Sequence, residues 1–205
     1  MPRAGLDRGK LIAAATRLAD RHGLDALTFR ALADELGVKP PSLYNHLESL
    51  EVLLGELRLA ATRDLMGRVT RAAVGRAGGD AIRAIATTWR LYAKEHPGLY
   101  AATVKAPARR DRALSSLNKS VMGLMVDVLA GFGWEGDGAI HAARALRSSL
   151  HGFAMLEQGG GFGLPPARDA SFEWMVETLI AGLSARSHEA TPGARSATAR
   201  RHAGG

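Results

Sequence analysis

The chain has 205 residues, 46% of them hydrophobic, and its 27 Lys and Arg against 20 Asp and Glu give a formal net charge of +7. This length and apolar content suffice for a buried core, and with only eight prolines the composition predicts an all-helical globular protein rather than a disordered one. The lack of cysteine excludes disulfides and thiolate metal sites. The first twenty residues carry charges throughout and no uncharged apolar run reaches about 18 residues, so we expect a cytoplasmic protein without a secretion signal or a membrane span.

The positive charge is spread along the chain instead of being gathered in one block. Residues 1–50 hold seven Lys and Arg against six Asp and Glu, and residues 51–104 hold eight against five. A polyanionic partner would therefore be bound by a few placed residues. Arg3, Arg8 and Lys10 come closest to a basic N-terminal arm, and most other arginines are expected on solvated helix faces.

Two helices are predicted in the first 37 residues. Apolar residues recur at spacings of three and four between Asp7 and His22, which predicts a helix that Gly23 stops. Thr28 is a suitable N-cap for a second helix of two turns, which Gly37 ends. So short a helix is not stable alone and must pack between neighbours.

Two consecutive prolines stand in the stretch GVKPPSLYNHLESL, residues 37–50. A proline forces the residue before it into an extended conformation and is tolerated in the first turn of a helix. We therefore expect Lys39 to be extended and a third helix to begin near Pro41. Leu43 and Leu47 lie one turn apart in this helix and face inward. The opposite, polar face carries Pro41, Ser42, Asn45 and His46.

The rest of the sequence predicts further helices, about nine in all. One starts at the cap Ser49 and is interrupted at 74–79, and the next is capped by Asp80 and ended by Pro97 and Gly98. A short segment at 99–104 precedes three longer helices, which span 111–132, 138–158 and 171–187, the last with Ser171 as its cap.

The domain boundaries follow from these elements. A domain of short helices is predicted at 1–50 and a domain of longer helices at 51–187. Residues 188–205 lack apolar periodicity, which predicts a disordered basic tail.

Three short helices with a glycine between the second and third, followed by a long one, form the arrangement of a helix-turn-helix, whose second element enters the DNA major groove. The stretch LTFRALADELGVKPPSLYNHLESLEVLL resembles the DNA-binding head of the tetracycline-repressor (TetR) family, with the likeness extending over 7–57. The matching residues are Leu27, Thr28, Leu32, Ala33, Leu36, Gly37, Val38, Leu43, Tyr44 and His46. The resemblance implies a transcription regulator that binds a double-stranded DNA operator, most often as a repressor. It makes 1–50 the helix-turn-helix DNA-binding domain and 51–187 the helical effector-binding and dimerisation domain.

The resemblance also implies which residues contact DNA. Lys39, Pro41, Ser42 and Asn45 stand where the family reads bases: Asn pairs with adenine, Ser bonds to several acceptors, and a proline or lysine stem contacts a thymine methyl. The positions that match contacts to the phosphate backbone are Thr28, Tyr44 and His46, with Arg30 at a position that contacts base or phosphate.

Several of these residues also fit a structural role that involves no DNA. Tyr44 fits a core aromatic, His46 a packing or capping residue, and Lys39 and Asn45 a solvated polar face. One position departs from the family, because Leu50 stands where a phosphate-binding lysine is usual, with Glu48 and Glu51 nearby. We therefore expect affinity to depend more on the N-terminal arginines and on the backbone N–H groups that follow Ser49.

A weaker likeness over 80–185 is to the TetR C-terminal class named for a Trp-His-Gly signature. Its landmarks are Trp89, HPGLY at 96–100, and LRSSLHGFAMLEQGGGF at 146–162. The resemblance implies a small-molecule effector that releases the DNA, and a homodimer through the last two helices, hence a near-palindromic operator. The candidate effector-binding residues, each of which also fits the core of a helix bundle, are Trp89, Tyr92, His96, Tyr100, Met122, Met125, His151, Phe153 and Met155.

The sequence offers no constellation for catalysis, a cofactor or a metal. The glycines at 159–163 do not fit the dinucleotide fingerprint, because no strand precedes them and Leu164 follows. The seven histidines show no metal-ligand spacing. We therefore predict a regulator that is not an enzyme. The alternative is a ligand-independent architectural or activating DNA-binding protein.

Overall fold

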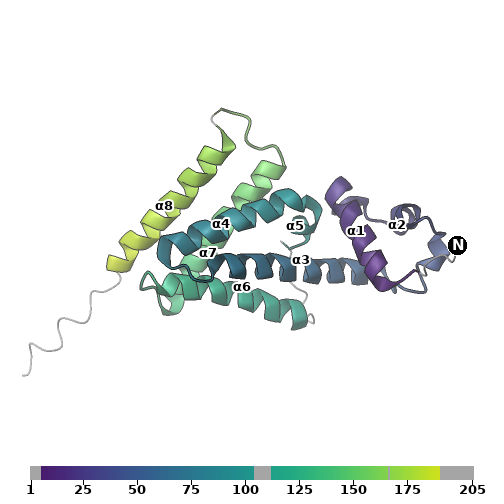
Figure 1. Cartoon of the computed structure of the whole chain (residues 1–205), viewed down its shortest axis with the longest axis horizontal. Helices are drawn as coiled ribbons and strands as arrows, with labels where there is room; N and C mark the ends of the chain where they lie inside the picture. The colour runs from purple at the N-terminus through teal and green to yellow at the C-terminus, as the bar shows by residue number, and fades with distance from the viewer. Residues whose placement is uncertain (1–5, 104–111, 166, 190–205) are drawn as a thin grey trace, which may run out of the picture. The chain divides into compact units, whose positions relative to one another are not determined.

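The structure is a computed structural model that describes residues 6–103, 112–165 and 167–189, and all regular elements in these ranges are helical (Figure 1). Eight α-helices and two 3-10 helices lie there, close to the nine predicted, and the all-helical fold class is confirmed. The described residues divide into two compact units, one formed by 6–74, 87–103 and 112–121, the other by 75–86, 122–165 and 167–189.

The first unit contains the N-terminal helices and the segments that pack on them. Its elements are α1 (Arg8–His22), η1 (Leu24–Ala26), α2 (Phe29–Leu36), η2 (Pro40–Ser42), α3 (Leu50–Ala73), the second half of α4 (Gly78–Glu95), α5 (Pro97–Thr103) and the first half of α6 (Arg112–Ala130). Two predicted caps are confirmed: the Thr28 hydroxyl accepts from Ala31 N at 3.1 Å, and the Ser49 hydroxyl accepts from Val52 N at 3.2 Å. Gly37 ends α2 with φ 65°, a left-handed conformation that glycine adopts without steric cost.

The double proline starts its segment one residue earlier than predicted. Lys39 is extended, with φ −81° and ψ 142°, and Pro40 rather than Pro41 is the first helical residue. Proline lacks a backbone N–H, and this costs nothing at the first helical position, because an N–H there has no partner within the helix. The turn is a tight 3-10 helix, closed by Ser42 N to the Lys39 carbonyl at 2.9 Å.

Two helix boundaries in the middle of the chain also differ from the prediction. Asp80 does not cap α4, because the helix already starts at Gly78 and the Asp80 carboxylate instead pairs with Arg83 at 2.9 Å. α4 ends at Glu95, just before Pro97, as predicted, but Pro97 is also the first residue of α5, which therefore begins two residues before the short segment predicted at 99–104. Proline can both follow one helix and occupy the first turn of the next.

One apolar core holds the head together. Its buried side chains come from α1, α2, the turn after the prolines, α3 and α5, and they are Leu11, Ala14, Ala15, Leu18, Leu27, Leu32, Ala33, Leu43, Leu47, Leu53, Leu57, Ala61 and Leu99. The predicted inward positions Leu43 and Leu47 are thus confirmed. The N-terminal half of α3 belongs to this core as much as α1 and α2 do.

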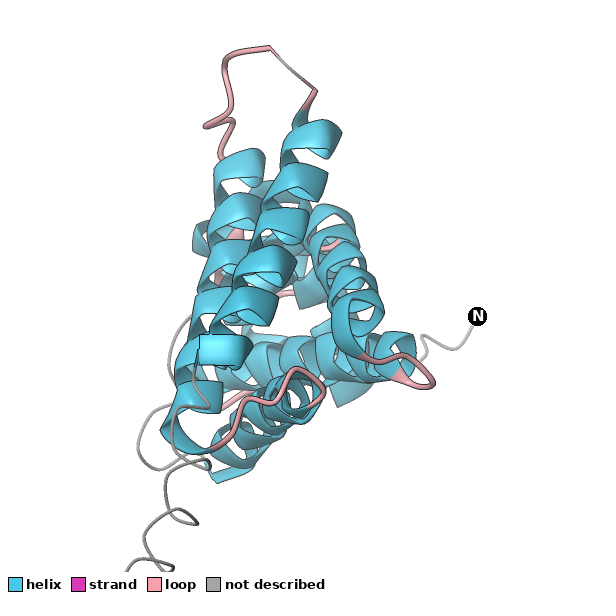
Figure 2. Ribbon diagram, turned by 90° about the vertical axis from the view of Figure 1, so that its left-hand side faces the viewer, coloured by secondary structure: helices cyan, strands magenta, loops and turns pink. Residues whose placement is uncertain are grey.

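The second unit is built around α7 (Gly136–Gln158) and α8 (Arg168–Glu189), which lie side by side in Figure 2. Phe153 on α7 packs against Phe172 on α8 and against Phe162 in the connecting loop, with ring centroids 5.1 and 4.8 Å away. Arg83 at the start of α4 makes a forked ion pair with Glu177 on α8, at 2.6 and 2.7 Å.

The start of the last helix corrects one more prediction. Ser171 lies inside α8, which begins at Arg168, and Ser171 N donates to the Ala167 carbonyl at 3.2 Å. The predicted tail at 188–205 lies outside the described residues except for its first two, which continue α8. In the described part of the chain, no helix combines the length and the apolar character that a membrane span requires.

Candidate DNA-binding surface

The segment that follows the double proline forms a compact turn, here called the reading segment (residues 39–47). Leu43 N donates to the Pro40 carbonyl at 3.0 Å, and His46 N and Leu47 N both donate to the Leu43 carbonyl at 2.9 Å. Leu43 and Leu47 are buried in the head core. The backbone bonds and the two leucines therefore fix one side of the segment and leave the other side free to face a partner.

The predicted base-reading residues lie on that free side. Lys39, Pro41 and Asn45 are exposed, and Ser42 is half-buried. All four lie within the seven residues 39–45 of the reading segment. Their placement matches what a major-groove reader needs, namely short polar and apolar side chains on a protruding turn.

Tyr44 is not a core aromatic. Its side chain is 62% exposed, and its ring stacks on Phe29 at the start of α2, with a centroid distance of 4.8 Å and an interplanar angle of 21°. The stack holds the phenol at the surface of the head. His46, the other predicted phosphate contact of this segment, is half-buried.

The N-terminus of α2 offers a second set of polar groups. Thr28 is exposed, and its hydroxyl oxygen caps the helix by accepting from Ala31 N. Arg30, in the first turn, is also exposed. A helix N-terminus favours an anion because its first N–H groups and its dipole both point toward one. This end of α2 can therefore receive a phosphate.

A pair of arginines on α1 fixes α2 in place. The Glu35 carboxylate of α2 accepts from Arg17 Nε at 3.1 Å and from Arg21 Nη2 at 2.5 Å. These hydrogen bonds lower the pKa of Glu35 below its ordinary value. Both arginines are exposed on α1, as expected for most arginines of the chain, and their guanidinium groups pair within the head.

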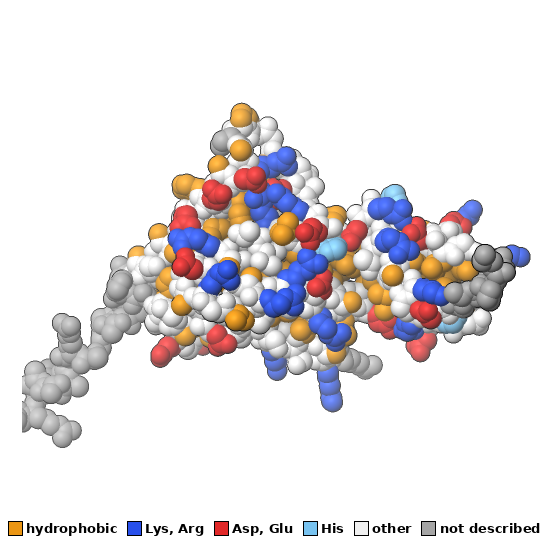
Figure 3. All heavy atoms as spheres, in the orientation of Figure 1, with side chains coloured by type: hydrophobic (Ala, Val, Ile, Leu, Met, Phe, Trp, Pro, Cys, Tyr) orange, Lys and Arg blue, Asp and Glu red, His pale blue; other side chains and the backbone are white. Residues whose placement is uncertain are grey.

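Two expectations about phosphate contacts can be placed on the structure. Leu50 is the first residue of α3 and packs, half-buried, against the head core, while Glu48 and Glu51 are exposed. Arg8, predicted as part of a basic arm, instead pairs with Glu56 on α3. Arg3 lies outside the described residues, and Lys10 is exposed beside Asp7. Figure 3 shows positive and negative side chains intermixed on the visible face.

Four of the predicted effector-binding residues lie in the first unit, on α4 and α5 and in the link between them. Trp89, Tyr92 and Tyr100 are buried and His96 is half-buried. Trp89 Nε1 donates to the Tyr100 hydroxyl at 2.7 Å, and the Tyr92 hydroxyl donates to the Ala61 carbonyl at 3.2 Å. Burial raises the pKa of the Tyr92 hydroxyl.

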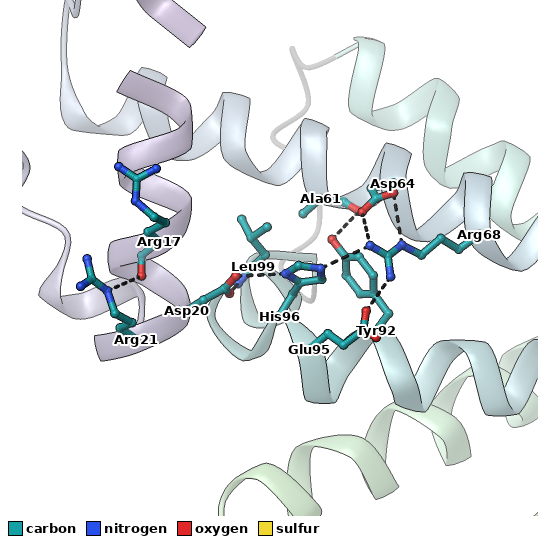
Figure 4. A network of polar contacts seen from close by, with 10 residues as sticks. All are labelled: Arg17, Asp20, Arg21, Ala61, Asp64, Arg68, Tyr92, Glu95, His96 and Leu99. Atoms are coloured by element: carbon teal, nitrogen blue, oxygen red, sulfur yellow. Dashed lines mark hydrogen bonds and ion pairs between the residues drawn. The ribbon is translucent and has the colours of Figure 1, made fainter. Parts of the chain in front are cut away.

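His96 sits in a chain of polar contacts that joins α1 to α3 (Figure 4). Its Nε2 lies 3.3 Å from Arg68 Nη2, and its Nδ1 lies 3.1 Å from the Asp20 carboxylate. Because a guanidinium only donates, Nε2 accepts and Nδ1 carries the proton. Asp20 also accepts from Leu99 N at 2.9 Å, so a carboxylate of α1 caps the first turn of α5.

The other five predicted effector-binding residues lie in the second unit. Met125 and Phe153 are buried, Met122 and His151 are half-buried, and Met155 is exposed. Burial, and then the charge of Arg147, lower the pKa of His151. Effector binding by these residues and by those of the first unit stays a prediction.

Sequence reasoning missed the residues that connect α1 with α5. Asp20 carried no prediction, because its partners His96 and Leu99 stand 76 and 79 residues further along the chain. Gly98 touches the same turn of α1. The HPGLY stretch at 96–100 was noticed as a landmark, but no local pattern reveals a contact over such a separation.

A two-turn helix, a left-handed glycine and a turn with an exposed polar face, all anchored on one core, define a helix-turn-helix DNA-binding head. Residues 11–57 match the family described as bacterial regulatory proteins, tetR family, and residues 82–179 match the tetracyclin repressor-like C-terminal domain. The chain belongs to the TetR family and is a DNA-binding transcriptional regulator. Regulators of this family bind DNA and dimerise.

Relatives agree with this assignment over most of the chain. An uncharacterised HTH-type transcriptional regulator of Mycobacterium tuberculosis is 37% identical over 185 residues, covering 90% of this chain and 84% of the relative. Another, from Bacillus subtilis, is 32% identical over 184 residues, covering 89% and 95%. Among solved structures, a TetR variant of Acinetobacter baumannii in complex with minocycline is 26% identical with a TM-score of 0.67, covering 89% of this chain and 99% of that one.

Proposed function

We propose that this regulator is a repressor that binds a near-palindromic operator as a homodimer and is released by a small-molecule ligand. The observation that carries the proposal is the reading segment, whose leucines are buried in the head core while Lys39, Pro41 and Asn45 are exposed together. A turn built in this way presents side chains to base edges without losing its own packing.

Within this proposal each exposed group has a chemical role. Asn45 bonds to an adenine edge, Ser42 to a base acceptor or donor, and the Lys39 stem and Pro41 pack on thymine methyl groups. Phosphates are bound at the α2 N-terminus and beside the reading segment. The residues assigned to those phosphate contacts are Thr28, Arg30, Tyr44 and His46.

The homodimer is proposed to form through α7 and α8. Ile140, Met155 and Leu156 on α7 and Trp174 on α8 are exposed large apolar residues. Gly152 lies exposed on α7, with no atom near the place where its Cβ would be, so a second helix can approach closely there. Four helices from two copies would cover this apolar surface as a bundle.

The proposed effector is a small molecule with an apolar part, because the candidate binding residues are mainly aromatic and Met side chains. The related TetR variant of Acinetobacter baumannii was solved with a small molecule, minocycline, which supports a ligand-responsive regulator. A ligand that favours a state with a shifted α3 would move the reading segment, because both belong to one core. The regulator needs no catalysis for this role, and it would act in the cytoplasm, where bacterial DNA is found.

One observation favours the alternative, a ligand-independent architectural or activating DNA-binding protein. The polar atoms of Trp89, Tyr92 and His96 are all bonded to protein partners, so none of them is open to a ligand without rearrangement. Under this alternative the C-terminal residues only build a core and a dimer interface.

A footprint of the purified full chain on the DNA that flanks its own gene tests the repressor proposal. We expect protection of one near-palindromic site at moderate salt and loss of that protection with an inducing ligand found by thermal-shift screening. No protected site would contradict the proposal in its autoregulatory form. A protected site that no stabilising ligand weakens would support the alternative.

A further inference from the structure

Arg8 is the first residue of α1, a position that is unfavourable for its charge. The N-terminus of a helix carries a partial positive charge, so a cation in the first turn is repelled and an acidic residue is preferred. α1 has no acidic residue in that turn. The Asp7 carboxylate caps this end of the helix by accepting from Lys10 N at 2.8 Å, and the Arg8 guanidinium makes its own hydrogen bonds outside α1.

Those contacts reach two segments that are distant in the sequence. Arg8 Nε lies 3.0 Å from each carboxylate oxygen of Glu56 on α3, and Nη2 donates to the same carboxylate. Nη1 donates to the main-chain carbonyl of His46 at 2.5 Å. The planar fork of an arginine can hold a carboxylate and a carbonyl at once, which a lysine ammonium does with less geometric constraint.

The carbonyl that Arg8 binds lies at the end of the reading segment. His46 closes the turn, and carbonyls at the end of a helical turn need donors from outside it. Arg8 is such a donor, and through Glu56 it joins the end of the reading segment to α3. The ring of Tyr44, stacked on Phe29, fixes the same turn to α2.

We infer that Arg8 is a positioning residue for base reading and not a phosphate contact. Asn45 directly precedes His46, so the contact that fixes the His46 carbonyl also limits where the Asn45 side chain lies. Hydrogen bonds to a base edge need their partner held to within about 0.5 Å, which requires supporting contacts of this kind. The Glu56 carboxylate meanwhile neutralises the charge that a phosphate contact would use. The inference rests on the proposed base-reading role of Asn45.

The test uses the full chain, a DNA duplex that the wild-type protein selects from a random-sequence pool, and a scrambled duplex of equal length. Fluorescence anisotropy over a salt series gives both affinities and the salt slope. We expect Arg8→Ala to lower affinity for the selected duplex about tenfold and to leave the scrambled duplex within about twofold. The salt slope should not change, whereas loss of a phosphate contact would reduce its magnitude by about 0.9.

Glu56→Ala separates the two roles by the ratio of selected to scrambled affinity. It removes a negative charge from the DNA-binding head, so if Arg8 were a phosphate contact, affinity for both duplexes should rise together and the ratio should stay as in the wild type. A positioning role predicts a lower ratio. The matched control is Glu51→Ala, which removes an exposed carboxylate from the first turn of the same helix and should leave the ratio unchanged.

Arg8→Lys keeps the positive charge and loses the planar fork of the guanidinium. It tests the inference if circular dichroism shows that Arg8→Ala is unfolded at the temperature of the binding assay. A reduced ratio with an unchanged salt slope in Arg8→Lys supports the inference. A wild-type ratio in both Arg8 variants, or a reduced salt slope in Arg8→Ala, overturns it while the base-reading proposal stands. A wild-type chain that selects no sequence overturns both.

Discussion

Asn45 shows how a single exposed side chain is prepared for recognition. It lies between buried Leu43 and Leu47, after a tyrosine fixed by stacking and before a carbonyl held by Arg8. Its own amide is exposed. The neighbours therefore supply the rigidity, and the amide is left to supply the two hydrogen bonds that an adenine edge accepts and donates.

We expect Asn45→Ala to remove discrimination at one operator position. The amide's two hydrogen bonds to adenine are worth about 1–3 kcal/mol of preference over other bases. Affinities for operators with each base at every position, measured by anisotropy, would show one position becoming tolerant. Equal losses on operator and scrambled DNA would contradict base reading by Asn45.

Leu50 allows the opposite kind of prediction, a gain. Leu50→Lys places a cation at the start of α3, where the resemblance to the family led us to expect a phosphate-binding lysine. Affinity should rise on operator and scrambled DNA alike, with the salt slope steeper by about 0.9 for one added contact. The control Leu50→Met keeps an apolar side chain against the head core and should leave the slope unchanged. An unchanged slope in Leu50→Lys would mean that no phosphate lies near this position.

At the scale of elements, α5 is the segment that connects most tightly to α1. Asp20 caps it from α1, and Gly98 lies so close that a Cβ would meet the Ala19 carbonyl oxygen at 1.9 Å. Backbone atoms cannot give way as a flexible side chain does. α1 and α5 are therefore in direct backbone contact, and only glycine permits it.

Gly98→Ala should consequently separate these two helices. We expect the free energy of unfolding to fall by about 1–3 kcal/mol, the usual cost of overpacking a tight contact. The matched control is Gly123→Ala in α6, where a Cβ would meet no atom within 4 Å. That change should be neutral or should stabilise by about 0.5–1 kcal/mol, because alanine favours a helix over glycine. Urea unfolding of both variants checks this, and similar stability in the two would contradict a close contact at Gly98.

The elements that sequence predicted well are those whose signals are local. Thr28 and Gly37 bound α2 as expected, because caps and left-handed glycines act within one turn. The end of α4 before Pro97 was predicted, but the start of α5 at Pro97 was not, because proline can both follow one helix and start the next. The partners of Arg8 and Asp20 were not predicted, because they lie 48 and 76 residues away and no periodicity encodes such pairs.

At the scale of the whole molecule, the proposed dimer would explain an apolar side chain that the single chain leaves open. Trp174 on α8 is 72% exposed, which is unusual for so large an apolar side chain. In a two-fold dimer the same residue occurs on both copies, so its burial counts twice. Binding to an operator with two half-sites needs the dimer, and the dimer would need the surface around Trp174, although this surface lies outside the head.

We expect Trp174→Glu to separate the dimer. A buried tryptophan removes about 150–250 Å² from water, and at about 25 cal/mol per Å² two copies contribute several kcal/mol to association. The substitution also brings an uncompensated carboxylate into the interface from each copy. The dissociation constant should rise at least about 100-fold by analytical ultracentrifugation, since each 1.4 kcal/mol is tenfold. Binding to a full operator should weaken while binding to a single half-site stays as in the wild type, because the head is untouched.

Leu91→Glu, the same kind of change at an exposed apolar position of α4, is the control and should leave the dimer intact. A Trp174→Glu chain that sediments as a wild-type dimer would exclude this face of α8 from the interface.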